Sequence, residues 1–390
     1  MITFTKKITD KVRESVKKVV SNSKYVSINY KAVEEFVNGE IRNYLKDYSY
    51  DKVENIISPK YHYIDLKDPL RSIWYFFVLD TINFCFWNFN DRDKWALIYK
   101  DDNKEEVVSG YLALALALKR EAISNPLFDK PSYWAKIFKG ELLRILYPFY
   151  EDLSHFKGEL MLLEERVTNL RELGENILGR PLVKLYQKLF ISKEDIKNIN
   201  EIRTYFKEDD ENNKILNLFD KSLDVNKFLE NVIYNFRSYN DKKDYVLKNG
   251  QNIEVYFYKR AQLLAHDLYL LYKYYEKFEP SLISKFPYLR LLNFKNIRDL
   301  TVFADYKLPQ LLEYKKIISY TDDLRNEIKQ GVIISSEKET EIRAATVVVC
   351  EIIANKLNIN EALLDNILWN MAKNTTNFNL PYHKSISIYY

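Results

Sequence analysis

The stretch YLALALALKREA, residues 111–122, decides between a helical and a strand interpretation of this chain. Its apolar residues alternate with period 2, which is typical of a half-buried strand. Its composition argues the opposite, because Leu, Ala, Lys, Arg and Glu are all strong helix formers. We therefore predict a buried helix at residues 111–122.

Helical patterns also dominate the rest of the chain. Amphipathic periodicity and capping signals predict helices at residues 5–20, 30–46, 158–175, 183–190, 253–277, 309–317 and, opened by a Ser336–Glu339 capping box, in the run EIRAATVVVCEIIANKL. Short strands are expected at residues 94–100, in a hairpin-like region before Gly110. The sequence therefore predicts a mainly α protein with a minor β element.

The 390 residues are enough to bury a large core in one unit, which we assign to residues 1–390. Residues 192–226 are the most polar part and include the acidic run EDDENN, residues 208–213. This part is a candidate surface insertion or sub-domain boundary, and an ordinary solvated face is the simpler explanation.

Composition excludes several classes of site. The net charge of +4, from 59 basic and 55 acidic side chains, does not indicate a protein that binds nucleic acid backbone. The two cysteines form no CxxC pair, the four histidines lack ligand spacing, and the eight glycines form neither a dinucleotide-binding nor a P-loop motif. These patterns indicate neither a disulfide framework nor a thiolate metal site, and they argue against a dinucleotide or P-loop phosphate site. No apolar run reaches transmembrane length and no signal peptide is recognised, so we expect a cytoplasmic protein without membrane contact.

Two helical patterns bring polar and aromatic side chains together. Asp80, Asn83, Phe84 and Trp87 follow helical spacing, which would suit a flat heterocycle by ring stacking and polar contacts to its edge. The alternative is a core helix whose Asp80 is paired internally. In the second pattern, Lys259, Arg260, Gln262 and His266 could bind an anion such as a phosphate, or could form a solvated face.

The segment LTVFADYKLPQ, residues 300–310, contains a carboxylate between apolar neighbours. Phe303 and Ala304 precede Asp305, and Leu308 with Pro309 follow it, so partial desolvation is expected. Buried carboxylates often have structural roles, and the residues alone leave structure and catalysis equally plausible for Asp305.

Four segments resemble signature stretches of the queuosine salvage proteins, which are queuosine 5′-phosphate nucleosidases. They are LDTINFCFW (79–87), FYKRAQLLAHDLY (257–269), LTVFADYKLPQ (300–310) and EIRAATVVVCE (341–351). Weaker similarity occurs at residues 165–178, 231–241 and 381–390, so the resemblance covers essentially the whole chain. The family's usual ADYRVPQ is ADYKLPQ here, which puts in doubt only a role that needs a guanidinium at Lys307.

The resemblance implies a helical fold similar to helix-hairpin-helix DNA glycosylases, without their nucleic acid surface. It implies hydrolysis of queuosine 5′-monophosphate to queuine, a 7-deazaguanine base, and ribose 5-phosphate, for queuine salvage and tRNA modification. It also implies that the reaction needs no metal and no organic cofactor. Asp305 matches the family's catalytic aspartate, and the motif around Asp80 matches the base pocket. The expected substrate-binding residues are Asp80, Asn83, Phe84, Trp87, Tyr306, Lys259, Arg260, Gln262, Glu341 and Arg343, with Lys259 and Arg260 near the phosphate.

The chemistry of this substrate leads to one further hypothesis. A 7-deazapurine has carbon in place of N7, so the leaving base cannot be protonated there. Asp80 or Glu341 could neutralise another edge of the base by holding a proton, which predicts a raised pKa for one of them. A helix-hairpin-helix nucleic acid glycosylase and a non-catalytic nucleotide-binding protein remain as alternatives. The oligomeric state and the job of Asp305 (electrostatic stabiliser, general base or nucleophile) stay open.

Overall fold

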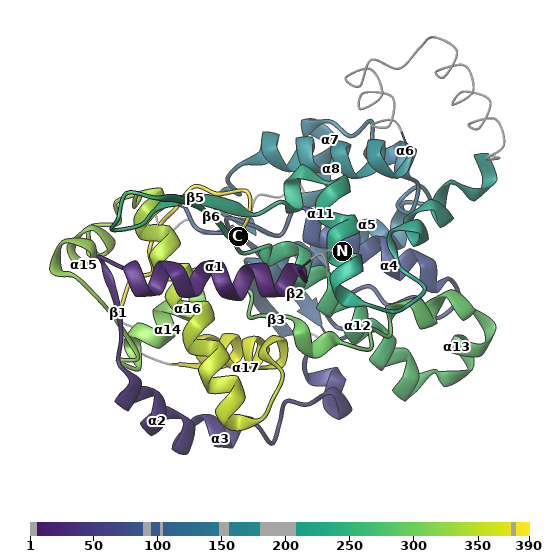
Figure 1. Ribbon diagram of the computed structural model, residues 1–390. Helices are drawn as coiled ribbons and strands as arrows, with labels where there is room; N and C mark the ends of the chain where they lie inside the picture. The colour runs from purple at the N-terminus through teal and green to yellow at the C-terminus, as the bar shows by residue number, and fades with distance from the viewer. Residues whose placement is uncertain (1–5, 89–94, 102–103, 148–155, 180–207, 376–379) are drawn as a thin grey trace, which may run out of the picture.

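The computed structural model describes residues 6–88, 95–101, 104–147, 156–179, 208–375 and 380–390 (Figure 1). Helices make up most of this part, and the prediction of a mainly α protein is confirmed. The α-helices are α1 (Ile8–Asn22), α2 (Tyr30–Asn38), α3 (Ile41–Tyr44), α4 (Pro69–Thr81), α5 (Tyr111–Ser124), α6 (Pro131–Trp134), α7 (Lys139–Leu146), α8 (Leu163–Ile177), α11 (Val225–Asn235), α12 (Lys259–Phe278), α13 (Pro280–Lys285), α14 (Lys307–Tyr314), α15 (Asp322–Lys329), α16 (Ser336–Leu357) and α17 (Glu361–Asn374). The 3-10 helices are η1 (Tyr50–Asn55), η4 (Glu208–Leu218), η5 (Arg237–Tyr239), η6 (Pro287–Leu292) and η7 (Ile297–Asp299).

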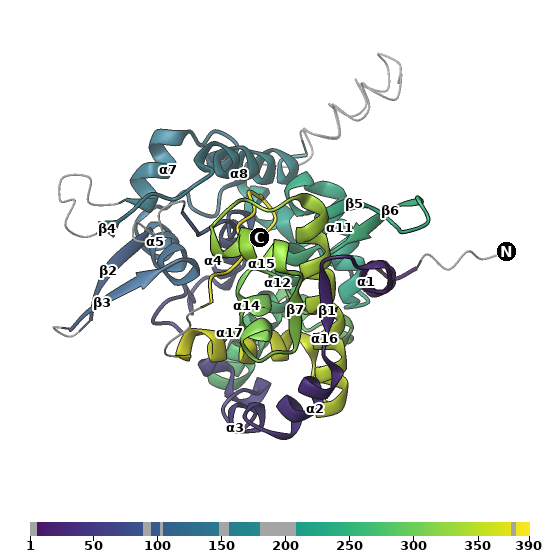
Figure 2. The ribbon, with the colours of Figure 1, turned by 90° about the vertical axis from the view of Figure 1, so that its left-hand side faces the viewer.

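The strands form three small antiparallel sheets at the periphery of the helices (Figure 2). Strand β1 (Val26–Ile28) pairs with β7 (Ile318–Tyr320), and β5 (Lys242–Val246) pairs with β6 (Asn252–Tyr256). In the third sheet, β2 (Ala96–Asp101) lies between β3 (Lys104–Ser109) and β4 (Phe156–Lys157). The strand predicted at residues 94–100 is thus confirmed as β2.

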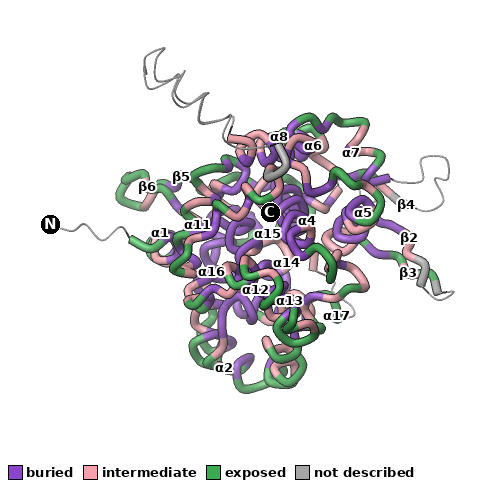
Figure 3. Tube along the Cα trace, turned by 90° about the vertical axis from the view of Figure 1, so that its right-hand side faces the viewer, coloured by how far each residue is buried: buried purple, intermediate pink, exposed green. Residues whose placement is uncertain are grey.

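The centre of the molecule is formed by α4, α12 and α16, which are buried on most of their faces (Figure 3). α12 packs against α4, and α1 packs against α16. α4 carries the run IWYFFVL, which is apolar all round, as expected for a helix surrounded by other elements. A charged side chain on these helices must therefore form an ion pair, lose its charge through a shifted pKa, or bind a ligand.

The helix predicted at residues 111–122 is confirmed as α5, which buries most of its Leu and Ala side chains. The prediction of a helix over residues 253–277 is wrong at its start. Residues 252–256 form β6, because NIEVY alternates and pairs with β5 across a turn in which Gly250 has φ 84°. α12 begins only at Lys259, after Tyr258 with φ 49°.

Two helix boundaries also differ from prediction. The residue that caps α16 is Ser335, whose Oγ accepts the Lys338 N–H at 3.4 Å, so the helix starts one residue before the proposed box would place it. α14 begins at Lys307 and makes Pro309 its third residue, where a backbone N–H would have no helical partner anyway.

The helix predicted at residues 183–190 lies outside the described residues, as do residues 192–207 of the polar stretch 192–226. Within its described part, the Asn212 carbonyl in η4 accepts a hydrogen bond from the Trp74 indole at 3.0 Å. The assignment of residues 1–390 to one unit stays a prediction. None of the described helices has the length and hydropathy that crossing a membrane requires.

Candidate active site

Asp305 occupies the junction between an extended segment and α14. Its Oδ1 accepts the N–H groups of Lys307 at 2.7 Å and Leu308 at 3.0 Å, which is the geometry of a helix N-cap. The residue is only half-buried, and Oδ2 accepts no hydrogen bond from the described residues. One oxygen therefore fixes the side chain, while the other is available to a ligand.

Asp80 lies in the last turn of α4 and is fully buried. The Asn83 Nδ2 donates to its Oδ1 at 3.3 Å, and Oδ2 has no partner among the described residues. Burial raises the pKa of Asp80 to about 7, and the Asn83 bond opposes part of that rise. Asp80 is therefore a carboxyl group that can hold a proton near neutral pH.

Lys259, the first residue of α12, connects these two acids electrostatically. Its side chain is buried, and its ammonium forms no hydrogen bond with the described residues. Burial lowers the pKa of Lys259, and the charges of Asp305, Asp365 and Asp80 oppose this effect. A single buried ammonium therefore lies among carboxylates that come from three distant parts of the chain.

Two further acids of this cluster, Asp267 and Asp365, were not identified from the sequence. Asp267 is on α12, and burial together with the neighbouring Asp80 raises its pKa well above the usual range. Asp365 is on α17, and burial together with Asp305 raises its pKa in the same way. Asp267 follows Lys259 by eight residues on one helix, a spacing that could have revealed it. Asp365 gives no local signal, because its position depends on how α17 packs.

The chain was compared with known proteins. The model of the family described as queuosine salvage protein matches residues 61–193 and 187–390. The chain belongs to the queuosine salvage protein family. It is 29% identical over 395 residues to a protein of Dictyostelium discoideum, which covers 97% of this chain and 98% of the relative. It is 27% identical over 405 residues to a protein of Nematostella vectensis, with the same shares of 97% and 98%.

A relative from Sphaerobacter thermophilus is 27% identical over 336 residues, which is 84% of each chain. All three relatives are named queuosine 5′-phosphate N-glycosylase/hydrolase. The resemblance to queuosine salvage proteins is thereby confirmed, whereas the roles of individual site residues stay predictions.

The pattern around Asp80 does not continue as a helix in this member of the queuosine salvage family. α4 ends at Thr81, so the prediction that four side chains share one helical face to Trp87 is wrong. The backbone turns away at Cys85, with φ 47°, and the Arg166 guanidinium donates to the carbonyls of Ile82, Phe84 and Cys85. A buried arginine thus replaces the helical hydrogen bonds that the segment lacks.

The aromatic residues of this segment have neighbours of their own. The centroid of the buried Phe84 ring lies 4.2 Å from the Arg166 guanidinium and 5.0 Å from that of Arg260. The Trp87 indole donates to the Ser385 carbonyl at 3.2 Å, which joins this segment to residues 380–390. Both rings therefore have packing partners without a ligand.

Three cationic residues were predicted to bind substrate, and two of them, Arg260 and Arg343, already donate hydrogen bonds to other groups of the protein. Unlike Lys259, Arg260 donates to the carbonyls of Asp80, at 2.9 Å, and of Thr81. Arg343 forms a buried bidentate pair with Asp241 at 3.0 and 2.6 Å, and its Nε donates to the Ala304 carbonyl at 3.2 Å. Both arginines support the backbone beside Asp80 and Asp305.

Glu341 and Gln262 are engaged in the same way. The Glu341 carboxylate accepts the N–H of Tyr25 at 2.7 Å and the hydroxyl of Tyr245 at 2.8 Å, among other donors. Gln262 exchanges hydrogen bonds with Thr301, including Thr301 N–H to Oε1 at 2.8 Å. Of the two acids expected to hold a proton, Asp80 therefore has the suitable surroundings, whereas both oxygens of Glu341 already accept hydrogen bonds from the protein.

Tyr306 follows Asp305 and is the remaining predicted residue. Its ring centroid lies 4.9 Å from that of Tyr382, in the segment formed by residues 380–390. Burial raises the pKa of the Tyr306 hydroxyl well above its usual range, so it stays a neutral donor.

Proposed function

We propose that this chain hydrolyses the N-glycosidic bond of queuosine 5′-monophosphate and releases queuine and ribose 5-phosphate. Family membership and the names of the relatives support this substrate. The observation that carries the proposal is the convergence of Asp305, Lys259 and Asp80, each with unused hydrogen-bonding capacity among the described residues. Such groups are what a polar ligand would satisfy.

At the ribose, Asp305 is the proposed catalytic residue. Cleavage transfers the electron pair of the bond between C1′ and the base nitrogen to the base, and C1′ becomes oxocarbenium-like. The Asp305 carboxylate stabilises this positive charge while a water oxygen forms the new bond to C1′. The N-cap fixes Oδ1, so Oδ2 is the oxygen that faces the sugar or the water. We favour charge stabilisation and water positioning over covalent attack.

At the base, Asp80 is the proposed proton donor. The departing 7-deazaguanine base carries negative charge and cannot accept a proton at position 7. Because the pKa of Asp80 is about 7, its protonated form is populated at neutral pH and can transfer the proton to another edge atom. The attacking water releases one proton to the carboxyl cluster, and this proton replaces the one that was transferred to the base. Asn83 orients the Asp80 carboxyl.

Lys259 is the proposed contact of the substrate's anionic part. Of the two cations expected near the phosphate, it is the one whose ammonium has no hydrogen bond within the described residues. We also propose a fold related to that of helix-hairpin-helix glycosylases and a cytoplasmic location. The proposed reaction needs no cofactor, and the protein is not expected to bind nucleic acid directly. We further propose that the released queuine is used for tRNA modification.

The test is an assay of the purified chain with queuosine 5′-monophosphate, in which free queuine is measured by chromatography. A parallel reaction contains an oligonucleotide with an internal queuosine. Release from the mononucleotide alone is the expected result. Release from the oligonucleotide alone would point to a nucleic acid glycosylase, and binding without release would point to a non-catalytic binding protein.

A further inference from the structure

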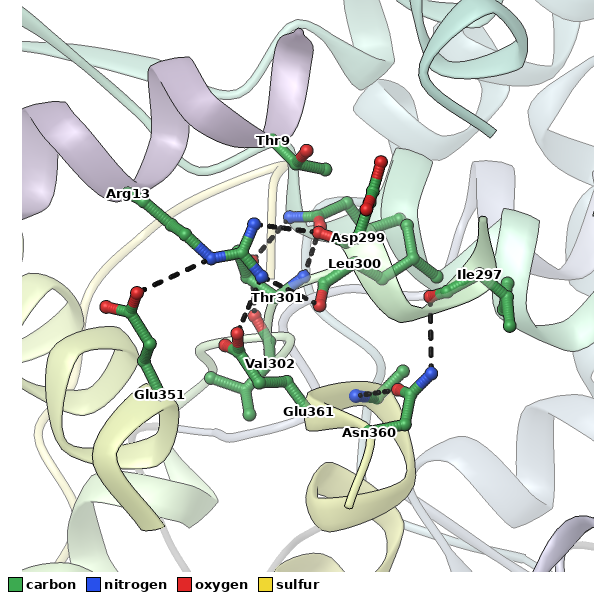
Figure 4. Close-up of polar contacts among 12 residues, drawn as sticks. Thr9, Arg13, Ile297, Asp299, Leu300, Thr301, Val302, Glu351, Asn360 and Glu361 are labelled. Atoms are coloured by element: carbon green, nitrogen blue, oxygen red, sulfur yellow. Dashed lines mark hydrogen bonds and ion pairs between the residues drawn. The ribbon is translucent and has the colours of Figure 1, made fainter. Parts of the chain in front are cut away.

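The extended segment that leads to Asp305 is tethered by side chains at nearly every residue. Arg13 of α1 donates to the Asp299 carbonyl at 2.9 Å and to the Leu300 carbonyl at 3.3 Å (Figure 4). Gln262 then binds Thr301, as described above. A segment without its own helix or ladder is thus fixed by partners from separate helices.

The first two turns of α17 supply the next tethers. Glu361 accepts from Arg13 Nη2 at 2.6 Å, and it lines a cavity of about 350 Å³ together with Arg13. One turn later, Asp365 Oδ1 accepts the Phe303 N–H at 2.8 Å. Phe303 is only two residues before Asp305, so this bond fixes the backbone close to the proposed catalytic carboxylate.

Asp365 differs from Glu361 in what else it faces. Its side chain interacts electrostatically with Asp305 and Lys259, which lie at the start of α14 and α12. Asp267 of α12 and Cys350 of α16 are the other titratable groups that respond to its charge. Burial and the charge of Asp305 raise the pKa of the Asp365 carboxyl well above its usual range, so Asp365 holds a proton more readily than an exposed aspartate does.

We propose that Asp365 is the positioning residue for Asp305. It accepts the Phe303 N–H to fix the segment, and its carboxyl keeps a proton, so that it adds no second negative charge to the surroundings of Asp305. The inference rests on the proposed function for its kinetic part, because Asp305 is the catalytic residue only in that proposal. The geometric part concerns the segment itself.

The decisive comparison is between Asp365→Asn and Asp365→Ala. Asparagine keeps an oxygen that can accept the Phe303 N–H and resembles the protonated acid, whereas alanine removes both properties. We expect the Asn variant to keep kcat within about threefold of wild type at pH 6 to 7, and the Ala variant to lose about tenfold or more with little change in KM, because a lost buried hydrogen bond releases the segment.

The pH profile separates positioning from mere stability. In wild type, ionisation of Asp365 as the pH rises adds a carboxylate that competes for the Lys259 ammonium and lowers kcat, in addition to the fall caused by deprotonation of Asp80. Asp365→Asn cannot ionise and is expected to lose only its own contribution, so that the fall assigned to Asp80 remains. Glu361→Gln is the matched control, since it alters the neighbouring tether on α17 without a group that faces Lys259. Its profile is expected to match wild type.

Hydrogen exchange of the peptide containing residues 303–308 tests the geometry without activity. Exchange is expected to be about tenfold faster in Asp365→Ala and unchanged in Asp365→Asn, since about one hydrogen bond is lost. Equal exchange in all three proteins, or an Asn variant as impaired as the Ala variant, would overturn the inference. Absence of queuine release by wild type would overturn the substrate proposal, and the exchange data would still decide the role of Asp365.

Discussion

Replacing Asp305 separates two jobs that the same carboxyl group performs. Its Oδ1 caps α14 through two hydrogen bonds, and its charge is proposed to stabilise the transition state. Asparagine caps a helix about as well as aspartate, so Asp305→Asn removes the charge and keeps the cap. Alanine removes both.

The magnitudes of the two effects follow from these contacts. Loss of one preorganised electrostatic group raises the barrier by about 2.7 to 4 kcal/mol, so kcat should fall by about 100- to 1,000-fold in both variants. Loss of the cap costs about 0.5 to 2 kcal/mol of folding free energy and applies to Asp305→Ala alone. In Asp305→Asn, only the charge interaction with the helix end is lost, at about 0.3 to 1 kcal/mol.

Steady-state release of queuine and urea unfolding measure the two effects on the same preparations. Asn29→Ala is the matched control, because Asn29 caps α2 by accepting the Ala32 N–H at 3.2 Å and has no place in the candidate site. It should lose stability as Asp305→Ala does and retain kcat. An Asp305→Asn variant with near-normal kcat would refute the catalytic assignment, and equal stability of the Asn and Ala variants would refute the cap.

Three further predictions concern stability. Burial raises the pKa of Asp80 to about 7, whereas the unfolded chain releases this proton near pH 4, so the stability of wild type falls as the pH rises between these values. Asp80→Asn should therefore be more stable than wild type at pH 8, by up to about 4 kcal/mol, and should lose this advantage at pH 4. Thermal unfolding at the two pH values measures the difference. Arg343→Met leaves Asp241 buried without its partner, so urea unfolding should show a loss of about 3 to 5 kcal/mol in the free energy of unfolding. Adding Asp241→Asn to this variant should restore part of the loss. No recovery in the double variant would argue against the ion pair. Gly174→Ala places a Cβ 2.2 Å from the Ala135 nitrogen where α8 crosses α6, so unfolding experiments should show a loss of at least about 1 to 3 kcal/mol, and a neutral result would contradict this close approach.

Local sequence patterns marked Asp305 and Lys259 as candidates, and the family resemblance selected them for the proposed site. Asp305 was recognised because an apolar run meets a helix start there. Lys259 was predicted inside a helix over residues 253–277, whereas it is the first residue of α12. The helix expected to continue from Asp80 to Trp87 was wrong for a tertiary reason. Arg166, more than 80 residues away in the chain, donates to carbonyls that follow the end of the helix, and no periodicity within the segment reveals this.

The same reasoning explains which partners could not be predicted. Arg260 and Arg343 have the composition of ligand-binding cations, yet their hydrogen bonds go to backbone and to Asp241. Asp365 stands in an ordinary amphipathic helix, and only the packing of α17 brings it to Phe303. Residue types therefore suggested candidate groups, whereas long-range packing decides which of these groups already have partners within the protein.

The tethered segment before Asp305 also has a consequence for folding. Its partners are Arg13, near the start of the chain, and Asp365, near its end, with Gln262 between them. Contacts so distant in sequence form slowly, after local helices have formed. A chain in which α17 has not yet packed would lack the Phe303 tether, so the segment before the proposed catalytic residue is fixed only after contacts from both sides of it in the sequence have formed.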